Sequence, residues 1–378
     1  MTNLVYLSPV PWSSFSQRSH KFVEWWHMRQ GGAVLWVEPY PTRLPNLGDV
    51  RRLRGKNGGG AQQLAVPDWI HVVRPSALPI EPLPFSRWLN RPLWQALMAA
   101  VEQFCKRGQA VLAVGKPSQL ALELLSRPWF GATVFDSMDH FSAFYRGLSR
   151  RVMAGRERQV VMTATAVMAS SSALCKQWAP VSRVVLPVFN ACDPAVLPPW
   201  RNCDGTSRSR AVFGYVGTLG PWFDWRAVLA LAHARPDALV RLIGPVFGSV
   251  PLVLPSNVEM LPACSHDQAM RAVADFDVGL IPFLRNTLTE SVDPIKYYEY
   301  RAMGLPVLST GFGEMRQRTG EQGVFLADSP DQIRRASEQA LDWKEPWEAA
   351  LDFRQQNSWS ERFDRSGVAE LLGVPSRV

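Results

Sequence analysis

The sequence predicts an α/β protein of two doubly wound, Rossmann-like domains that face a central cleft. Three observations lead to this fold class. Short apolar runs alternate with helical patterns in both halves of the chain. A stretch rich in Pro, Ser and Arg separates the halves, and glycine-containing turns follow several apolar runs. We expect an N-terminal domain over 1–185, a linker over 186–211, a C-terminal domain over 212–350 and a tail over 351–378.

Length and composition restrict the class of protein. A chain of 378 residues with 47% apolar and 20% charged residues can bury two cores of ordinary size. The five cysteines form no C-x-x-C pair and no zinc-finger spacing, which indicates free thiols in a reducing cytoplasm. The sequence shows no signal peptide and no apolar run long enough to span a membrane, so we expect a cytoplasmic protein.

A formal net charge of +8 occurs together with fifteen tryptophans. Basic residues beside interfacial aromatics are typical of proteins that attach to an anionic membrane face. The predicted surface combines a long loop over 41–66 with a basic amphipathic helix over Phe85–Phe104. The alternative is a solvated basic surface over an aromatic core. Nucleic-acid binding is not expected, because no recognisable binding module accompanies the charge.

The first domain opens with a strand at Leu4–Leu7, a helix from about Phe15 to Gln30 and a strand at Ala33–Val37. The first turn is not G-x-G-x-x-G, which argues against a dehydrogenase. Such turns lie at the ligand crevice of doubly wound sheets. We therefore predict acceptor contacts for three polar residues of this turn, namely Ser14, Gln17 and Arg18. Arg18 could meet an acceptor phosphate or could be a surface arginine.

A second group of polar residues follows the predicted strand Thr133–Phe135. Asp136, Asp139 and His140 come directly after this strand. Acidic groups and a histidine at the carboxyl end of a strand are in place for proton transfer, so these are the candidate catalytic residues. The alternative role for Asp139 is to cap a helix.

In the second half, the strand Phe213–Val216 leads into a turn that contains Gly217 and Thr218. Glycine lets backbone N–H groups approach a diphosphate closely. The segment 291–310 then predicts a loop, a helix that Gly304 ends, and a short strand. Lys296 and Glu299 lie in the first turns of that helix, near the positive end of its dipole. This arrangement favours a phosphorylated ligand that also carries hydroxyl groups.

The segment 291–310 resembles the donor-binding helix of GT-B glycosyltransferases, especially the large retaining family 4. Glu299 matches the second glutamate of that family's Glu-x7-Glu pattern, which holds the ribose hydroxyls of the nucleotide, while the first glutamate is replaced by Ser291. A related bacterial subgroup, the group 1 type involved in cell-surface polysaccharides, carries Asp-Pro-x-Lys-x-x-Glu-Tyr. The residues that match this version are Asp293, Pro294, Lys296, Glu299 and Tyr300.

The resemblance implies the chemistry of the donor site. The donor would be a UDP- or GDP-sugar, held without a metal or a cofactor. The usual Arg and Lys of the glycine turn are missing, so Lys296 would face the diphosphate, with Arg285 as a weaker candidate. The predicted donor-binding residues are Gly217, Thr218, Arg285, Lys296, Glu299 and Tyr300. The resemblance also covers the Asp136–Asp139 stretch, and the tail resembles a closing helix that returns to the N-terminal domain.

The predicted function is therefore glycosyl transfer to a lipid-linked or other glycan acceptor in cell-surface polysaccharide biosynthesis. Such an enzyme would be peripheral on the cytoplasmic face of the inner membrane. A nucleotide-sugar 2-epimerase of the same fold is the first alternative, and a catalytically silent subunit that activates a partner is the second. The donor sugar, the acceptor and the stereochemical outcome stay open, with either Asp136 or Asp139 as the base if the reaction inverts configuration.

Overall fold

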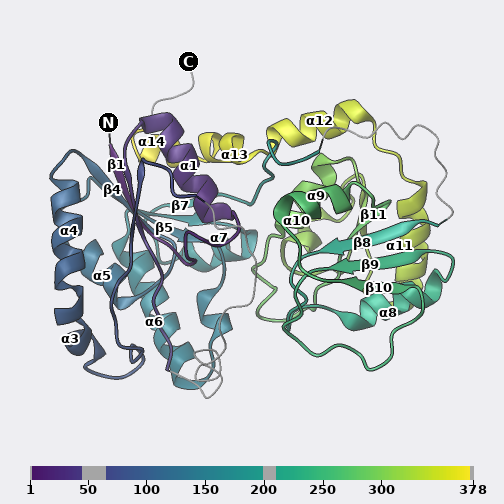
Figure 1. Ribbon diagram of the computed structural model, residues 1–378, viewed down its shortest axis with the longest axis horizontal. Helices are drawn as coiled ribbons and strands as arrows, with labels where there is room; N and C mark the ends of the chain where they lie inside the picture. The colour runs from purple at the N-terminus through teal and green to yellow at the C-terminus, as the bar shows by residue number, and fades with distance from the viewer. Residues whose placement is uncertain (1, 45–64, 199–209, 375–378) are drawn as a thin grey trace. The chain divides into compact units, whose positions relative to one another are not determined.

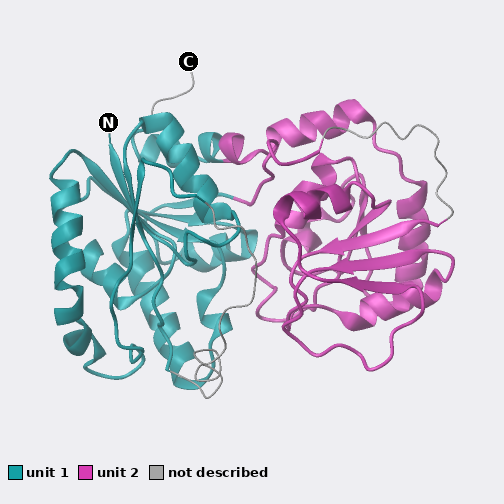
Figure 2. Cartoon of the chain, in the orientation of Figure 1, with its two compact units in different colours: residues 1–188, 363–378 teal, residues 189–362 magenta. Residues whose placement is uncertain are grey.

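Figure 1 shows a computed structural model that describes residues 2–44, 65–198 and 210–374. The chain forms two compact units, which Figure 2 distinguishes by colour. Unit 1 contains Met1–Val188 and Phe363–Val378, and unit 2 contains Phe189–Arg362. The division thus falls at the start of the predicted linker and within the predicted tail. The loop predicted over 41–66 and the linker predicted over 186–211 lie partly outside the described residues.

Unit 1 is built on a parallel seven-stranded sheet with the strand order β3-β2-β1-β4-β5-β6-β7. The order runs outward from β1 on one side and from β4 on the other, which makes the carboxyl ends of these two strands the topological switch point. All neighbouring strands pair in parallel, and the central strand β4 is apolar along its whole length. The strands are β1 Asn3–Leu7, β2 Val34–Val37, β3 Ile70–Val73, β4 Ala110–Val114, β5 Ala132–Ser137, β6 Ala166–Ala169 and β7 Val185–Pro187.

The helices of unit 1 cover both faces of this sheet (Figure 1). The first begins at Arg18, three residues later than predicted, and ends where Gly31 takes a left-handed conformation. The helices are α1 Arg18–Gln30, α3 Ser86–Asn90, η1 Pro92–Trp94, α4 Gln95–Cys105, α5 Gln119–Leu125, η2 Phe141–Phe144, α6 Gly147–Thr163, α7 Ser172–Trp178 and α14 Val368–Leu371. Helix α13 Trp359–Arg365 crosses the division between the units.

One prediction about the aromatic, basic first half was wrong. The helix predicted over Phe85–Phe104 is three shorter segments, because Pro92 lacks the N–H that a continuous helix needs. The tryptophans of this half are mostly core residues, as the alternative of an aromatic core expects: Trp25, Trp26, Trp36 and Trp94 are buried. Trp88 is exposed. The aromatic content of unit 1 therefore serves mainly its core.

Unit 2 repeats the architecture with a parallel six-stranded sheet in the order β10-β9-β8-β11-β12-β13. Its switch point lies between β8 and β11, and α8 and α11 pack together on the sheet (Figure 1). The strands are β8 Val212–Val216, β9 Leu239–Ile243, β10 Val258–Leu261, β11 Val278–Ile281, β12 Val307–Ser309 and β13 Val324–Leu326. The helices are α8 Trp225–Ala234, α9 His266–Val273, α10 Ile295–Ala302, η3 Gly313–Arg318, α11 Pro330–Asp342 and α12 Trp347–Gln356.

Candidate active site

The turn after β8 lies at the switch point of unit 2. Gly217 has a φ of 145°, which side chains rarely tolerate, and its N–H donates to the carbonyl of Ile243 at 2.8 Å. A Cβ atom at this position would lie 2.7 Å from both Cε and Nζ of Lys296. The lysine side chain therefore lies directly against the glycine turn.

Lys296 belongs to the first turn of α10 and packs over an aromatic ring. Its Nζ lies 5.2 Å from the ring centroid of Tyr215, at the end of β8. Burial lowers the pKa of this amine, while the nearby Glu299 carboxylate opposes that change. Because burial disfavours the charged ammonium, a negatively charged neighbour stabilises the protonated form of Lys296 more than it would that of a surface lysine.

Glu299 follows Lys296 by three residues, so both side chains lie on one side of α10. It is partly exposed, and burial raises its pKa, while the charges of Lys296 and His266 counteract the rise. A carboxylate beside the helix start can accept hydrogen bonds from ribose hydroxyls. The structure thus brings together Gly217, Lys296 and Glu299, which the sequence predicted for one site.

Tyr300 has a different place from the one predicted. Its side chain is fully buried in the core of unit 2, and its hydroxyl accepts a hydrogen bond from the Val216 N–H at 3.3 Å. This tyrosine supports the strand end just before Gly217 and has no surface to offer a ligand. The backbone at Thr218 is also fixed by a tyrosine, since the Tyr215 hydroxyl donates to the Thr218 carbonyl at 2.9 Å.

Arg285 lies in the loop after β11 and is exposed. Its guanidinium contacts the Asp328 carboxylate at 3.1 Å, and the same carboxylate accepts the Gly311 N–H at 2.8 Å. Arg285 therefore has a partner on the loop after β13, whereas the Lys296 side chain lies against the Gly217 turn.

Sequence reasoning missed the structural role of Asp293, the first residue of the motif that resembles the surface-polysaccharide subgroup. Its buried carboxylate accepts hydrogen bonds from the Asn190 N–H at 2.7 Å and the Tyr298 hydroxyl at 2.9 Å, and it pairs with Arg318 at 2.7 Å. Asn190 also donates a side-chain hydrogen bond to the Asp293 carbonyl. This network fixes the start of α10 to the first residues of unit 2, and so it fixes Lys296.

In unit 1, two residues predicted for separate roles form one buried ion pair. Arg18 of α1 contacts Asp136 of β5 at 2.9 Å, with both side chains almost wholly buried. Arg18 also donates to the Val188 carbonyl at 2.7 Å, and Tyr6 donates weakly to Asp136 at 3.4 Å. A carboxylate enclosed in this way cannot reach a substrate hydroxyl. The pairing instead joins α1 to the carboxyl end of β5.

Asp139 has the properties that Asp136 lacks. It lies three residues further along, beyond the end of β5, and is partly exposed. Burial of the carboxyl raises its pKa to about 7; the charge of Arg18 opposes this rise, and the charge of Asp136 adds to it. A carboxyl group poised near neutral pH is suited to general-base catalysis.

Glu157 of α6 is a neighbour of Asp139 that the sequence did not reveal. It is buried, and it accepts the Phe141 N–H at 3.3 Å. Burial raises the pKa of Glu157 to about 8, and the charge of Asp139 contributes to the rise. His140, the residue after Asp139, is partly exposed, and its backbone carbonyl accepts the Ala143 N–H.

The turn after β1 is closed by its own hydrogen bonds. The Gln17 N–H donates to Nδ1 of His20, and Nε2 of His20 donates to the Trp12 carbonyl at 3.1 Å. Burial lowers the pKa of His20 to about 4, so this imidazole is neutral and acts as a cap. Ser14 donates its N–H to the Pro11 carbonyl within the same turn. Ser14 and Gln17 are both partly exposed.

No family model matches this sequence. A segment of 109 residues is 28% identical to the putative teichuronic acid biosynthesis glycosyltransferase TuaH of Bacillus subtilis, and the match covers 27% of each chain. The chain thus spans about a quarter of the length of the curated relative it matches.

Solved structures match over almost the whole chain. Sucrose-phosphate synthase from Thermosynechococcus elongatus superposes with a TM-score of 0.69 at 13% identity, covering 99% of both chains. The lipopolysaccharide outer core galactosyltransferase WaaB superposes with a TM-score of 0.61 at 12% identity, covering 98% of this chain and 100% of that one. The chain has the GT-B fold. An α,α-trehalose 6-phosphate synthase from Burkholderia multivorans is similar at a TM-score of 0.61 and 12% identity, with 99% of both chains covered.

The GT-B assignment confirms the predicted fold class and the resemblance seen in the segment 291–310. At these identities, similarity to solved structures establishes the fold rather than the reaction. Within residues 2–44, 65–198 and 210–374, no helix has the length and apolar character needed to cross a bilayer. The same ranges contain no cluster of three or more His, Cys, Asp or Glu residues arranged to hold a metal. Metal independence remains a prediction.

Proposed function

We propose that this GT-B protein is a glycosyltransferase that moves a sugar from a nucleotide-sugar donor to an acceptor hydroxyl. The observation that carries the proposal is the position of Lys296 against the Gly217 turn. The curated relative TuaH and WaaB are both named as glycosyltransferases.

The donor would be a UDP- or GDP-sugar bound to unit 2. Backbone N–H groups of the Gly217 turn and the start of α10 would contact the diphosphate, and Lys296 would neutralise its charge. Glu299 would accept hydrogen bonds from the ribose hydroxyls. Asp293 and Tyr300 would act indirectly, because they hold α10 and the end of β8 in place.

Asp139 would be the general base for the acceptor, which we place on unit 1. The acceptor oxygen would attack the anomeric carbon of the donor sugar, while the bond from that carbon to the diphosphate oxygen breaks. The acceptor proton would pass to Asp139, and the nucleoside diphosphate would leave with its charge stabilised by Lys296. A single displacement of this kind inverts the anomeric configuration.

For the acceptor we propose a lipid-linked glycan of a cell-surface polysaccharide. The names of two similar proteins, a teichuronic acid glycosyltransferase and a lipopolysaccharide galactosyltransferase, support this class. Such an acceptor would place the enzyme at the cytoplasmic face of the inner membrane.

A panel of UDP-, GDP- and dTDP-sugars tests this function. Thermal stabilisation by one donor, followed by transfer of its sugar to polyprenyl-linked glycans, would support it. Conversion of a bound donor into its 2-epimer without an acceptor would identify the epimerase alternative. A folded protein that none of the donors stabilises would contradict both enzyme functions and favour a non-catalytic subunit.

A further inference from the structure

Helix α3 of unit 1 buries polar side chains and exposes apolar ones. Its polar residues Ser86 and Asn90 are buried, whereas Trp88 and Leu89 are exposed, with Trp88 at 74%. Phe85, just before the helix, is 81% exposed. Leu93 of η1 extends this apolar face. A soluble surface helix normally shows the opposite pattern, so this face is suited to contact another apolar phase.

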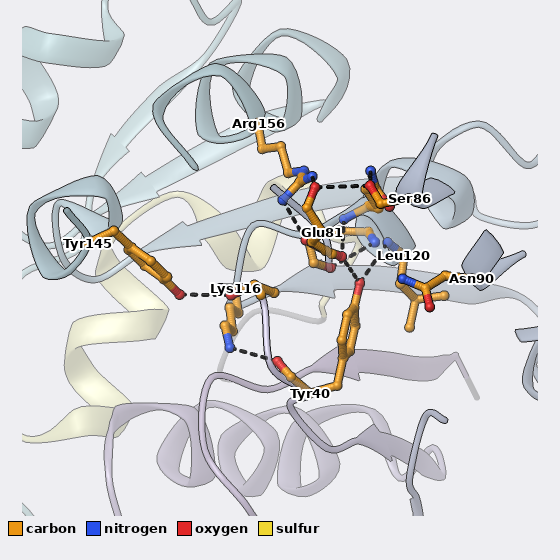
Figure 3. A network of polar contacts seen from close by, with 12 residues as sticks. Tyr40, Glu81, Ser86, Asn90, Lys116, Leu120, Tyr145 and Arg156 are labelled. Atoms are coloured by element: carbon orange, nitrogen blue, oxygen red, sulfur yellow. Dashed lines mark hydrogen bonds and ion pairs between the residues drawn. The ribbon is translucent and has the colours of Figure 1, made fainter. Parts of the chain in front are cut away.

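Buried hydrogen bonds enforce this orientation (Figure 3). Ser86 donates to the Glu81 carbonyl at 3.0 Å, and the side-chain oxygen of Asn90 accepts the Leu78 N–H at 2.7 Å. The Glu81 carboxylate is itself buried and pairs with Arg156 of α6 at 2.6 Å. Rotating α3 to hide its apolar face would break these contacts, each costly to leave unpaired.

Phe85 adds a second anomaly. Its φ is 62°, and in the described part of the chain it is the one residue other than glycine with a positive φ. A bulky residue in the left-handed region is strained by about 1–3 kcal/mol. The fold therefore holds a strained aromatic side chain out in solvent, where it makes little contribution to the core of unit 1.

Positive charge is concentrated beside this face. The buried Glu123 carboxylate contacts Arg87 at 2.5 Å, Arg91 at 3.9 Å and Arg127 at 4.0 Å. Three arginines around one carboxylate leave two positive charges in excess. Guanidinium groups oriented in this way still have N–H donors for phosphate oxygens.

A surface cavity of about 500 Å³ lies between these arginines and the core. It is lined by Trp94, Met98 and Trp129, by the basic Arg91 and Arg127, and by the acidic Glu102 and Glu123, among others. The cavity itself therefore has no excess of positive charge. Arg91 and Arg127 are 62% and 37% exposed, so they can contact lipid phosphates from its edge.

We propose that Phe85, Trp88, Leu89 and Leu93, with Arg91 and Arg127 beside them, form a docking surface for an anionic lipid bilayer. The aromatic and leucine side chains would enter the headgroup boundary, and the arginines would contact lipid phosphates. A second copy of the chain is a poorer occupant, because a two-fold contact would bring the arginines of one copy against those of the other. The docking surface deepens the proposed function by placing a lipid-linked acceptor within reach, but its test uses neither donor nor acceptor.

The test is flotation of the purified full chain with vesicles of phosphatidylcholine containing phosphatidylglycerol, compared with pure phosphatidylcholine. We expect binding to the anionic vesicles that weakens as salt is added. Phe85→Gly combined with Trp88→Ala should lower binding on the order of tenfold. Because glycine relieves the strain at position 85, this variant should stay folded. Phe247→Ala, at a 68% exposed aromatic of unit 2, is the matched control and should bind as the wild type does.

Arg91→Gln combined with Arg127→Gln should remove the preference for anionic lipid, while Arg87 still pairs with Glu123. The proposal is overturned if the wild type ignores anionic vesicles, or if the Phe85 and Trp88 variant binds them unchanged. It is also overturned if that variant instead dissociates a dimer or a protein complex. A negative result here leaves donor binding and sugar transfer to be decided by their own assays.

Discussion

Lys296 occupies the space that a side chain at Gly217 would need, with Cε and Nζ 2.7 Å from the ideal Cβ position. One residue is at the end of β8 and the other in the first turn of α10, so the contact joins the two elements on either side of the proposed diphosphate. Neither residue can change without affecting the other.

Lys296→Ala should weaken donor binding about 30- to 150-fold, because the loss of a charge-assisted contact to a diphosphate costs ~2–3 kcal/mol. Isothermal titration with the donor identified by thermal stabilisation measures this effect. Arg285→Gln is the control, since Arg285 is exposed and paired with Asp328. Equal losses in both variants would mean that Lys296 has no special place at the phosphate.

Gly217→Ala should destabilise the protein by about 1–3 kcal/mol, because alanine is strained at a φ of 145° and its Cβ meets Lys296. Donor affinity should fall as well, since Lys296 must move. Urea unfolding measures the stability. Gly155→Ala is the matched control: Gly155 lies within α6 with no atom within 4 Å of an added Cβ, and alanine should be neutral or slightly stabilising there.

Asp139→Asn should reduce turnover by about 10²- to 10⁴-fold while leaving donor affinity unchanged, as expected for loss of a general base. In the wild type, kcat/KM should rise with pH through about 7, where Asp139 loses its proton. The rising limb should be absent in the variant. A variant that retains full activity, or a wild-type profile that is flat between pH 6 and 8, would refute the role of Asp139.

Glu157 links stability to pH. Its carboxyl has a pKa of about 8 in the fold and an ordinary value of 4.5 when unfolded, so the folded state binds more protons between these values. The free energy of unfolding should therefore fall as pH rises through this window. Glu157→Gln should remove on the order of 3 kcal/mol of this pH dependence between about pH 5 and pH 8. Urea unfolding at pH 5 and pH 8 measures this change. An equal change in the free energy of unfolding between the two pH values in the wild type and the variant would rule out a buried, protonated Glu157.

Asp293→Asn should destabilise unit 2 by about 3–5 kcal/mol, since it leaves Arg318 buried without its carboxylate. Thermal unfolding measures the loss. The exposed pair of Asp237 and Arg235 provides the control, because Asp237→Asn should leave the midpoint unchanged. A mild effect at Asp293 would show that its network does not anchor α10.

Two doubly wound domains could be predicted from the sequence because parallel strands are buried on both faces and appear as apolar runs such as Leu4–Leu7. The GT-B fold itself was implied by the resemblance of the segment 291–310. The turn at Gly217 and the end of α10 near Gly304 could also be predicted from the sequence, because both positions have a positive φ, which favours glycine. These local signals required no knowledge of distant contacts.

Long-range pairing could not be read in this way. Arg18 and Asp136 are 118 residues apart in the chain, and only the sheet brings them together, so Asp136 and Asp139 looked equivalent in sequence. The orientation of α3 was hidden as well, because Glu81 and Arg156 that fix it lie outside the helix. Tyr300 matched a binding motif, yet it serves the core.

Donor binding by Lys296 is tested most directly by titrating UDP- and GDP-sugars into the wild type and Lys296→Ala, monitored by isothermal calorimetry. At least one nucleotide sugar should bind the wild type, and the variant should lose most of that affinity while remaining folded. Equal affinity in both proteins, or no binding of any nucleotide sugar to the folded wild type, would contradict donor binding by Lys296.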